Sequence, residues 1–251
     1  MKEIKLQVPN AGALSNGLSN LLKRFSNLEK QILIKLNNDS IESTMSNMQK
    51  SVVKFHRMEL GNLIQPFQLE QPMYIPLVIA DKLTKVLDFF GDSEIEMTIK
   101  YDKVEEKDVA LMIQFHNSSL NMELMCSKIS LFQISMKITD VILEKLSSTE
   151  DSLYSIDIDA ANISKLKNLA SNNINEEIYF IAGSNGVIFK GDGFEYNLDP
   201  SNIGTSDKYG FSKNNIKNLD NEDYTMFMLK ERSLFKSKDG NTLVVISKLI
   251  E

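Results

Sequence analysis

The chain has 251 residues, of which 42% are hydrophobic and 25% are charged, and its formal net charge is −6. This composition supports a substantial core and excludes global disorder. The acidic balance argues against a protein that coats nucleic acid with its whole surface. The absence of a long apolar stretch, the charged N-terminus and the single Cys126 favour a cytosolic protein, in the host cytoplasm if the protein is viral.

One local pattern, a strand followed by an amphipathic helix and a further strand, occurs four times along the chain. The opening strands are expected at 4–8, 73–78, 153–158 and 208–211, and the helices at 13–25, 80–90, 161–170 and 213–219. A chain built from copies of one unit predicts a pseudo-symmetric fold. We therefore expect function to lie in the assembled surface rather than in one catalytic cluster.

β-rich runs follow the first two helices. Strands are expected at 31–37, 41–46 and 51–60, and then as a meander at 94–101, 109–116 and 120–126. The segment from 129 to 146 is ambiguous, because 130–136 is typical of a strand and 140–146 of either a strand or a short helix.

The polar segment 147–152 predicts a boundary between two domains, 1–148 and 149–251, with its exact position between 128 and 152. Beyond it, Asp159 is placed to cap the helix that starts at Ala160. Ser184-Asn-Gly186 and Asp192-Gly193 are typical hairpin turns. The last strands are expected at 224–229, 233–236 and 243–248, which completes an α+β pattern with antiparallel sheets.

Basic side chains lie off the apolar stripe of every predicted helix. They are Lys23 and Arg24 in the first, Lys82 and Lys85 in the second, Lys165 or Lys167 in the third, and Lys213 and Lys217, expected to be free, in the fourth. Lysines on a solvated helix face are common and need no function. Because the protein is acidic overall, the pattern also fits a concave basic surface that faces the phosphates of a duplex.

Several segments together resemble a known family. They are Tyr154–Ala170, Glu177–Lys190, Asp223–Leu229 and Asn241–Leu249 in the C-terminal half, and Leu21–Phe25 and Ile79–Phe90 in the N-terminal half. The chain resembles the DNA polymerase sliding clamps, which are processivity factors. It is similar to the proliferating-cell-nuclear-antigen type and, more closely in the C-terminal half, to the T-even bacteriophage clamps. The resemblance covers nearly the whole length in the order of elements, although no single motif is diagnostic.

This resemblance implies a two-domain clamp fold, with helices on the inner face and antiparallel sheets outside. It implies a homotrimer that closes head to tail into a ring around double-stranded DNA, binds it without sequence preference, and works with a DNA polymerase and a clamp loader. The eight basic residues would line the ring. An apolar groove for partner peptides, beneath the connector between the domains, would use Met48, Val52, Leu131, Leu249 and Ile250.

The sequence supports a catalytic function less well than it supports a clamp. Asp157 and Asp159 could in principle hold a metal, but strand alternation and helix capping explain both. The two histidines, His56 and His116, each fall inside a β run, and Cys126 is expected to be a packed strand residue. We expect no enzyme activity, no cofactor and no metal. Two hypotheses remain: a replicative sliding clamp, or a β-rich DNA-binding or scaffold protein of clamp-like fold that does not encircle DNA.

Overall fold

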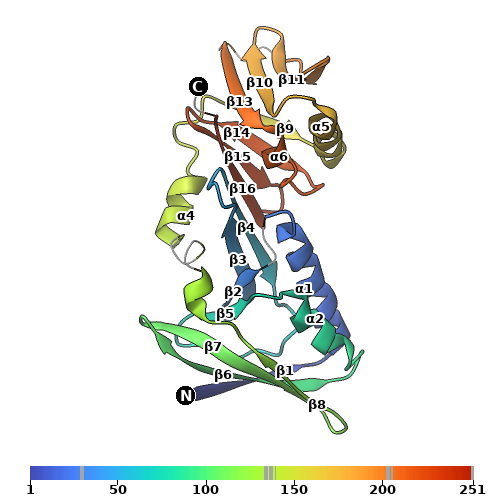
Figure 1. Ribbon diagram of the computed structural model, residues 1–251, viewed down its shortest axis with the longest axis vertical. Coiled ribbons are helices and arrows are strands. Elements are labelled where there is room, and N and C mark those ends of the chain that lie inside the picture. Colours follow the sequence, from blue (N-terminus) through green and yellow to red (C-terminus); the bar gives the residue numbers. More distant parts are fainter. Residues whose placement is uncertain are drawn as a thin grey trace. The chain divides into compact units, whose positions relative to one another are not determined.

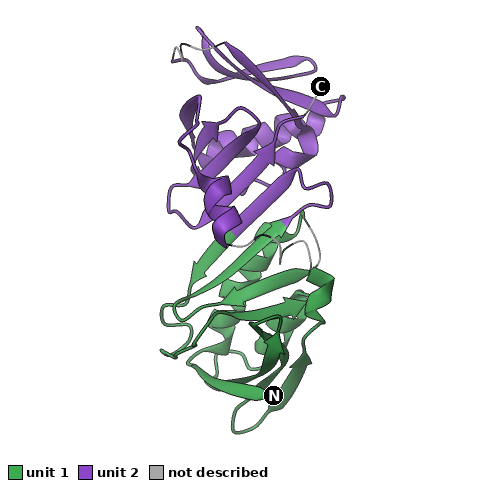
Figure 2. Cartoon of the chain, turned by 90° about the vertical axis from the view of Figure 1, so that its left-hand side faces the viewer, with its two compact units in different colours: residues 1–45, 56–137 green, residues 46–55, 138–251 purple. Residues whose placement is uncertain are grey.

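The computed structural model describes residues 1–28, 31–132, 135, 138, 140–201, 204 and 206–249. The chain forms two compact units, coloured separately in Figure 2. Unit 1 comprises Met1–Met45 and His56–Lys137, and unit 2 comprises Ser46–Phe55 and Ile138–Glu251. The boundary that the sequence suggests, between residues 148 and 149, falls inside unit 2. No helix in the described ranges is long and apolar enough to cross a membrane.

Unit 1 is a sheet covered on one face by two helices. Its elements are β1 (Lys2–Val8), α1 (Ala11–Phe25), β2 (Ile32–Leu36), β3 (Ser40–Ser46), β4 (Val52–Glu59), β5 (Met73–Leu77), α2 (Asp81–Asp88), β6 (Ile95–Val104), β7 (Lys107–His116), β8 (Asn121–Met125) and the 3-10 turn η1 (Ile129–Phe132). The strand order is β1-β6-β7-β5-β2-β3, and β8 pairs with β7. Strand β4 contributes residues to both units.

Unit 2 contains two antiparallel sheets. Its elements are α4 (Asp140–Ser147), β9 (Tyr154–Ile158), α5 (Ala160–Asn172), β10 (Glu177–Gly183), β11 (Gly186–Gly191), β12 (Phe194–Asp199), β13 (Asp207–Ser212), α6 (Lys213–Ile216), β14 (Tyr224–Met228), β15 (Arg232–Ser237) and β16 (Thr242–Ser247). One sheet has the order β16-β15-β14-β9, and the other has the order β12-β11-β10-β13.

The structure confirms the repeated strand–helix–strand order as β1-α1-β2, β5-α2-β6, β9-α5-β10 and β13-α6-β14 (Figure 1). Within each unit the two helices pack together, α1 with α2 and α5 with α6. The predicted Asn-Gly hairpin is also confirmed between β10 and β11. Gly186 has a φ of +93°, and an added Cβ would lie 1.7 Å from the Asp199 carbonyl oxygen, so only glycine fits there.

Two expectations about the chain's elements differ from the structure. The strand predicted over 130–136 is wrong for the described residues, because η1 is a 3-10 turn in which Phe132 alone is buried and no strand-like alternation develops. Gln133, Ile134 and Met136 lie outside the described residues. The second ambiguous segment is the helix α4. The fourth repeated helix is shorter than predicted, since α6 is one turn over Lys213–Ile216.

The apolar stripes on the helices form the cores. In unit 1, Leu14, Leu18 and Leu21 of α1 are at most 3% exposed and join the buried residues of the sheet in one cluster. In unit 2, Tyr224 and Phe235 meet edge to face with ring centroids 6.1 Å apart. Burying such a side chain stabilises the fold by about 1.5–3 kcal/mol, so each stripe fixes which face of its helix turns outward.

Candidate nucleic-acid interface

Helices α1 and α2 of unit 1 are locked together through polar as well as apolar contacts. Asn10 caps α1 by accepting a hydrogen bond from the Ala13 amide at 2.7 Å. The Ser15 hydroxyl of α1 lies 2.6 Å from Asp88 Oδ1 and 3.2 Å from the Thr84 carbonyl oxygen, both on α2. The Gly12 amide, in the first turn of α1, donates to the Gly91 carbonyl beyond α2, so the start of α1 meets the end of α2.

Three exposed basic residues lie in the last turn of α1 and on α2. Lys23 is exposed in the last turn of α1, and Lys82 and Lys85 are exposed on α2. Lys85 lies 2.5 Å from Asp81, and this hydrogen bond holds the pKa of the Asp81 carboxyl below its usual value. Lys82 occupies the first turn of α2, where the helix dipole disfavours a positive charge. Its position therefore has no explanation in helix stability.

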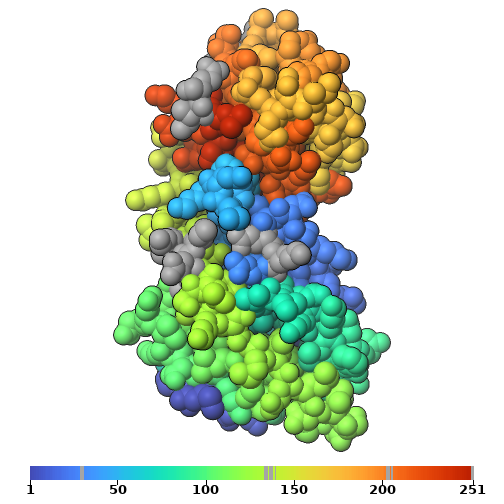
Figure 3. Space-filling model, viewed as in Figure 1, coloured from blue at the N-terminus to red at the C-terminus, as the bar shows by residue number. Residues whose placement is uncertain are grey.

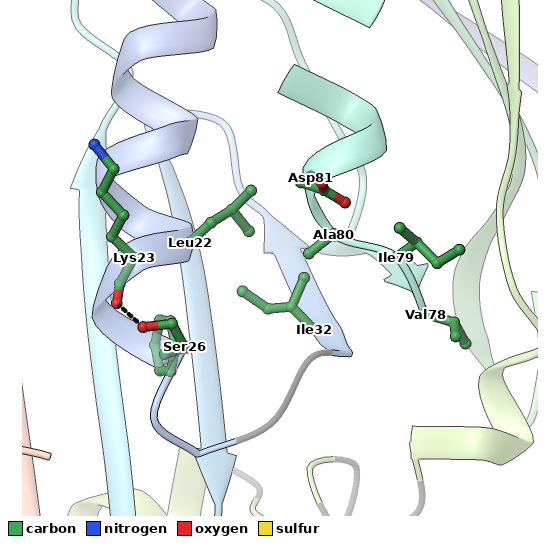
Figure 4. A pocket seen from close by; sticks show the side chains of 9 residues that line it. Leu22, Lys23, Ser26, Ile32, Val78, Ile79, Ala80 and Asp81 are labelled. Carbon is green, nitrogen blue, oxygen red and sulfur yellow. Dashed lines mark hydrogen bonds between the residues drawn. The ribbon is translucent and has the colours of Figure 1, made fainter. Parts of the chain in front are cut away.

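A pocket of about 510 Å³ opens between the last turn of α1 and the start of α2. Leu22, Ile32 and Ala80 turn toward it in Figure 4. The lysine stem of Lys23 lies at its margin, and the ammonium group points away along α1. The pocket is therefore an apolar hollow with the lysine charge outside it.

Helix α5 of unit 2 begins where the sequence predicts. Asp159 accepts a hydrogen bond from the Asn162 amide at 2.7 Å, and Asp223 accepts one from the Ala160 amide at 2.8 Å. Buried Ile163 and Leu166 turn the exposed Lys165 outward, where its ammonium lies 3.9 Å from the centre of the Tyr196 ring on β12. This contact orients Lys165 and leaves its charge at the surface.

Two of the predicted lining lysines bind backbone carbonyls of unit 2. Lys167 donates to the Leu219 carbonyl at 2.8 Å and to Asn221 Oδ1 at 3.1 Å, and burial lowers its pKa from the ordinary lysine value. Lys213 donates to the carbonyls of Asn173 and Ile174, at 2.7 Å and 3.2 Å. Both ammonium groups thus donate hydrogen bonds to backbone carbonyl oxygens just past the C-terminal end of a helix.

The expectation that Lys213 and Lys217 are free is wrong, because Lys213 caps α5 as described and Lys217 donates to Asn214 Oδ1 at 3.0 Å. Lys217 and Arg24 are both half-buried. Spacing in a sequence shows which side of a helix a lysine occupies. It does not show that a neighbouring turn places carbonyl oxygens within reach of that lysine.

Lys54 on β4 is a charged residue that the sequence reasoning did not single out. Its side chain is 1% exposed, it forms an ion pair with Asp220 at 2.8 Å, and it donates to the Asn218 carbonyl at 2.9 Å. The alternation of strand β4 indicates that Lys54 points inward, because Val52 and His56, two positions before and after it, are both buried on the same strand. A lysine at an inward strand position needs a buried partner.

The five residues predicted for a partner groove have different environments. Met48 is 83% exposed and Leu131 is 56% exposed, whereas Val52 is fully buried. Leu249 is half-buried, and its amide donates to the Gly210 carbonyl at 2.9 Å. Ile250 lies outside the described residues. Met48, Val52 and Leu249 belong to unit 2 and Leu131 to unit 1.

Residues with catalytic potential have structural roles in this fold. Asp159 caps α5, and Asp157 lies 2.5 Å from the Lys238 ammonium, which with Thr225 lowers the pKa of the Asp157 carboxyl. Burial raises the pKa of the Cys126 thiol to about 12, which keeps it protonated. Among the described residues, no group of three or more His, Cys, Asp or Glu side chains could hold a metal ion.

The arrangement of helices and sheets is that of the DNA sliding clamps, so the protein has the α+β DNA-clamp fold. The proliferating cell nuclear antigen (PCNA) of A. fulgidus, solved with the C-terminal region of FEN-1, matches with a TM-score of 0.61 and 12% identity, over 98% of this chain and 99% of that one. In the PCNA2–PCNA3 complex of Sulfolobus tokodaii, a chain matches with a TM-score of 0.57 and 10% identity, over 99% and 100%.

A bacterial clamp also matches. The DNA polymerase III beta chain of Streptococcus pneumoniae gives a TM-score of 0.64 and 13% identity, over 99% of this chain and 65% of that one. The chain therefore spans about two thirds of the bacterial beta chain. No protein-family model and no curated protein matches the sequence.

Proposed function

We propose that this protein is a sliding clamp that encircles duplex DNA and tethers a replicative DNA polymerase, without chemistry of its own. The observation that carries the proposal is the match to PCNA over 98% of this chain and 99% of that one. A likeness of both units in sequence order supports a shared way of working more strongly than a match to one domain would. The closer relation to T-even bacteriophage clamps remains a prediction.

The DNA contact would come mainly from the exposed lysines of α1, α2 and α5. Of the eight predicted lining residues, Lys23, Lys82, Lys85 and Lys165 are exposed and best placed to reach phosphates. The other four would border the lining: the half-buried Arg24, and Lys167, Lys213 and Lys217, whose ammonium groups donate to oxygens of unit 2. Phosphate contacts carry no base information, so such a surface binds any sequence and lets the protein slide.

The ring would be a homotrimer with head-to-tail joints between edge strands. Strand β8 branches from the main strand order of unit 1 and pairs with β7, and β12 at one end of a unit 2 sheet pairs with β11. Each of these regions carries a large exposed apolar side chain. Met125 on β8 is 69% exposed. Ile174 is 86% exposed and lies near the β11–β12 turn, because the amide of its neighbour Asn175 donates to Asp192 in that turn. An edge strand of this kind is a template for pairing with another chain.

Partners would include the polymerase and a loader that opens the ring. The predicted groove residues Met48, Val52, Leu131, Leu249 and Ile250 remain the proposal for peptide docking, with Met48 and Leu131 the most accessible among those described. The double variant Met48→Ser with Leu131→Ser, which removes both exposed apolar side chains, should stimulate the polymerase less and should assemble like the unaltered protein.

The proposal is tested by asking whether retention on DNA is topological. Protein is mixed with linear duplex at low salt, the ends are blocked with biotin and streptavidin, and the salt is raised until charge contacts are lost. After the salt is raised, a ring remains bound to end-blocked DNA but slides off DNA whose ends are free. A non-encircling DNA-binding or scaffold protein dissociates from both DNAs, and that result would overturn the proposal.

A further inference from the structure

The end of the first helix in each unit borders a space that unit 2 fills and unit 1 leaves open. In unit 2, β13 runs directly into α6, and Lys213, the first residue of α6, reaches the carbonyls of Asn173 and Ile174 just past α5. In unit 1, the linker 78–80 separates β5 from α2, and the pocket of about 510 Å³ lies between this linker and the last turn of α1. The hollow therefore belongs to the repeated architecture, at the place where unit 2 inserts a lysine side chain.

The hollow is lined mainly by apolar side chains. Phe25 and Ile32 are both 2% exposed and belong to the core of unit 1. Val78 and Ile79 of the linker also line the hollow, yet they are 38% and 49% exposed. Figure 3 shows the blue-green atoms around α2 at the surface, on the right of the molecule. The volume lies in the range of about 300–1,000 Å³ that is usual for small-molecule sites, and an apolar ligand would remove the two exposed side chains from water.

A cation has little to gain in this hollow. The carbonyl of Lys23 already accepts two hydrogen bonds from Ser26, one from the hydroxyl at 2.8 Å (Figure 4) and one from the amide at 3.3 Å. Asp81, the acidic residue among the described lining residues, lies 2.5 Å from the Lys85 ammonium. Unlike the carbonyls that bind Lys213 in unit 2, these oxygens are therefore already paired within unit 1.

Two lysines beside the hollow can instead receive an anion. Lys23 lines the hollow, and Lys82 directly follows Asp81, which also lines it. Both lysines are exposed, and within the described part of the chain neither ammonium forms a hydrogen bond or an ion pair. The Lys23 ammonium points away along α1 in Figure 4, and rotation about its four-carbon stem would bring it to the mouth of the hollow. Because Lys85 balances Asp81, the other two lysines give the mouth a net positive charge.

We propose that this hollow binds a small organic anion that combines an apolar body with one carboxylate. The apolar body would lie between the last turn of α1 and the linker 78–80, and the carboxylate would lie at Lys23 and Lys82. The apolar walls supply the affinity, and the two lysines select the charge. The site shares no residue with the predicted peptide groove. The inference goes beyond the proposed function, because it requires neither a ring nor DNA.

The first test compares three probes that share one ring system and differ in charge. They are 2-naphthoate, 2-naphthalenemethanol and 2-naphthylmethylammonium, each titrated into the unaltered protein and followed by its fluorescence. We expect 2-naphthoate to bind about fivefold more tightly than the neutral alcohol, and the ammonium probe to bind most weakly. Equal binding of all three, tightest binding of the ammonium probe, or binding of none would overturn the proposal.

The second test places the probe on the molecule. Ala80→Phe puts a ring into the hollow and should weaken 2-naphthoate binding about tenfold, whereas the matched control Ala161→Phe, exposed in the first turn of α5, should not. Lys23→Met with Lys82→Met should bind 2-naphthoate and the alcohol equally, whereas the charge control Lys103→Met should keep the preference for the anion.

Thermal melting of each variant verifies that it is folded. The lysine variants change only exposed residues, so they keep the test decisive if Ala80→Phe does not fold. Undiminished 2-naphthoate binding by folded Ala80→Phe, or an unchanged preference for the anion in the double lysine variant, would overturn the proposal. Because no DNA is used, these results do not depend on the clamp assignment.

Discussion

Lys82 and Lys213 provide a matched comparison, because both lysines are in the first turn of a repeated helix and only one is held by carbonyls. Lys213→Met removes two ammonium–carbonyl hydrogen bonds, of 2.7 Å and 3.2 Å, and keeps most of the apolar stem. Hydrogen bonds to charged groups contribute about 1.5–3 kcal/mol, and the bond to Ile174 is exposed, so we expect a total loss of about 1.5 kcal/mol. For a chain of this size, that lowers Tm by about 3–6 °C.

Lys82→Met should leave the stability of the fold nearly unchanged and should instead alter the salt dependence of DNA binding. Lys82 is exposed at the unfavourable end of the α2 dipole, so its removal should change stability by less than about 0.5 kcal/mol. If its ammonium contacts a phosphate, the slope of log K against log salt should fall by about 0.9 for each subunit that contacts the DNA. Lys103→Met on β6 serves as the charge control and should change neither quantity.

The measurements are thermal unfolding at fixed protein concentration and fluorescence anisotropy with a labelled duplex between 50 and 200 mM salt, for all three variants in the same buffer. The reasoning would be refuted if Lys213→Met melted like the unaltered protein, or if Lys82→Met bound DNA with an unchanged salt slope.

Three further predictions follow from single residues. Lys54→Met should lower the free energy of unfolding by about 2–3 kcal/mol in urea titrations, less than the full cost of breaking a buried pair because Asp220 is 21% exposed; an unchanged midpoint would contradict it. Met125→Glu should yield a folded protein that sediments as a monomer, and a persistent trimer would rule out the β8 joint. Cys126, whose thiol pKa is raised to about 12 by burial, should react with a thiol reagent at pH 8 at least 100-fold more slowly than the urea-unfolded chain, and equal rates would refute its burial.

The features that could be predicted from the sequence depend on local physics. The four strand–helix–strand units follow from hydrophobic periodicity, and the start of α5 follows from Asp159, whose carboxylate was expected to cap it and does so. The hairpin at Gly186 follows from a backbone conformation that other residues avoid. In each case the information lies within a few residues of the feature.

The features that could not be predicted depend on contacts between distant parts of the chain. The carbonyls that Lys213 binds belong to residues 173 and 174, and the partner of Lys54 is Asp220. The 3-10 turn at η1 has the apolar residues of a strand, but burial selects Phe132 alone. Helix α4 was one of two open readings, because the short apolar run Val141–Leu143 is typical of a strand as well as of a helix, and the cluster on which Leu143 and Leu146 pack comes from distant strands.

An image of the purified particle by electron microscopy tests the central claim most directly. The account predicts a closed ring of about 86 kDa, three chains of 28.5 kDa each, with a hole wide enough for duplex DNA and with α1, α2, α5 and α6 on its inner wall. A particle without a central hole, or a ring with these helices on the outside, would contradict it.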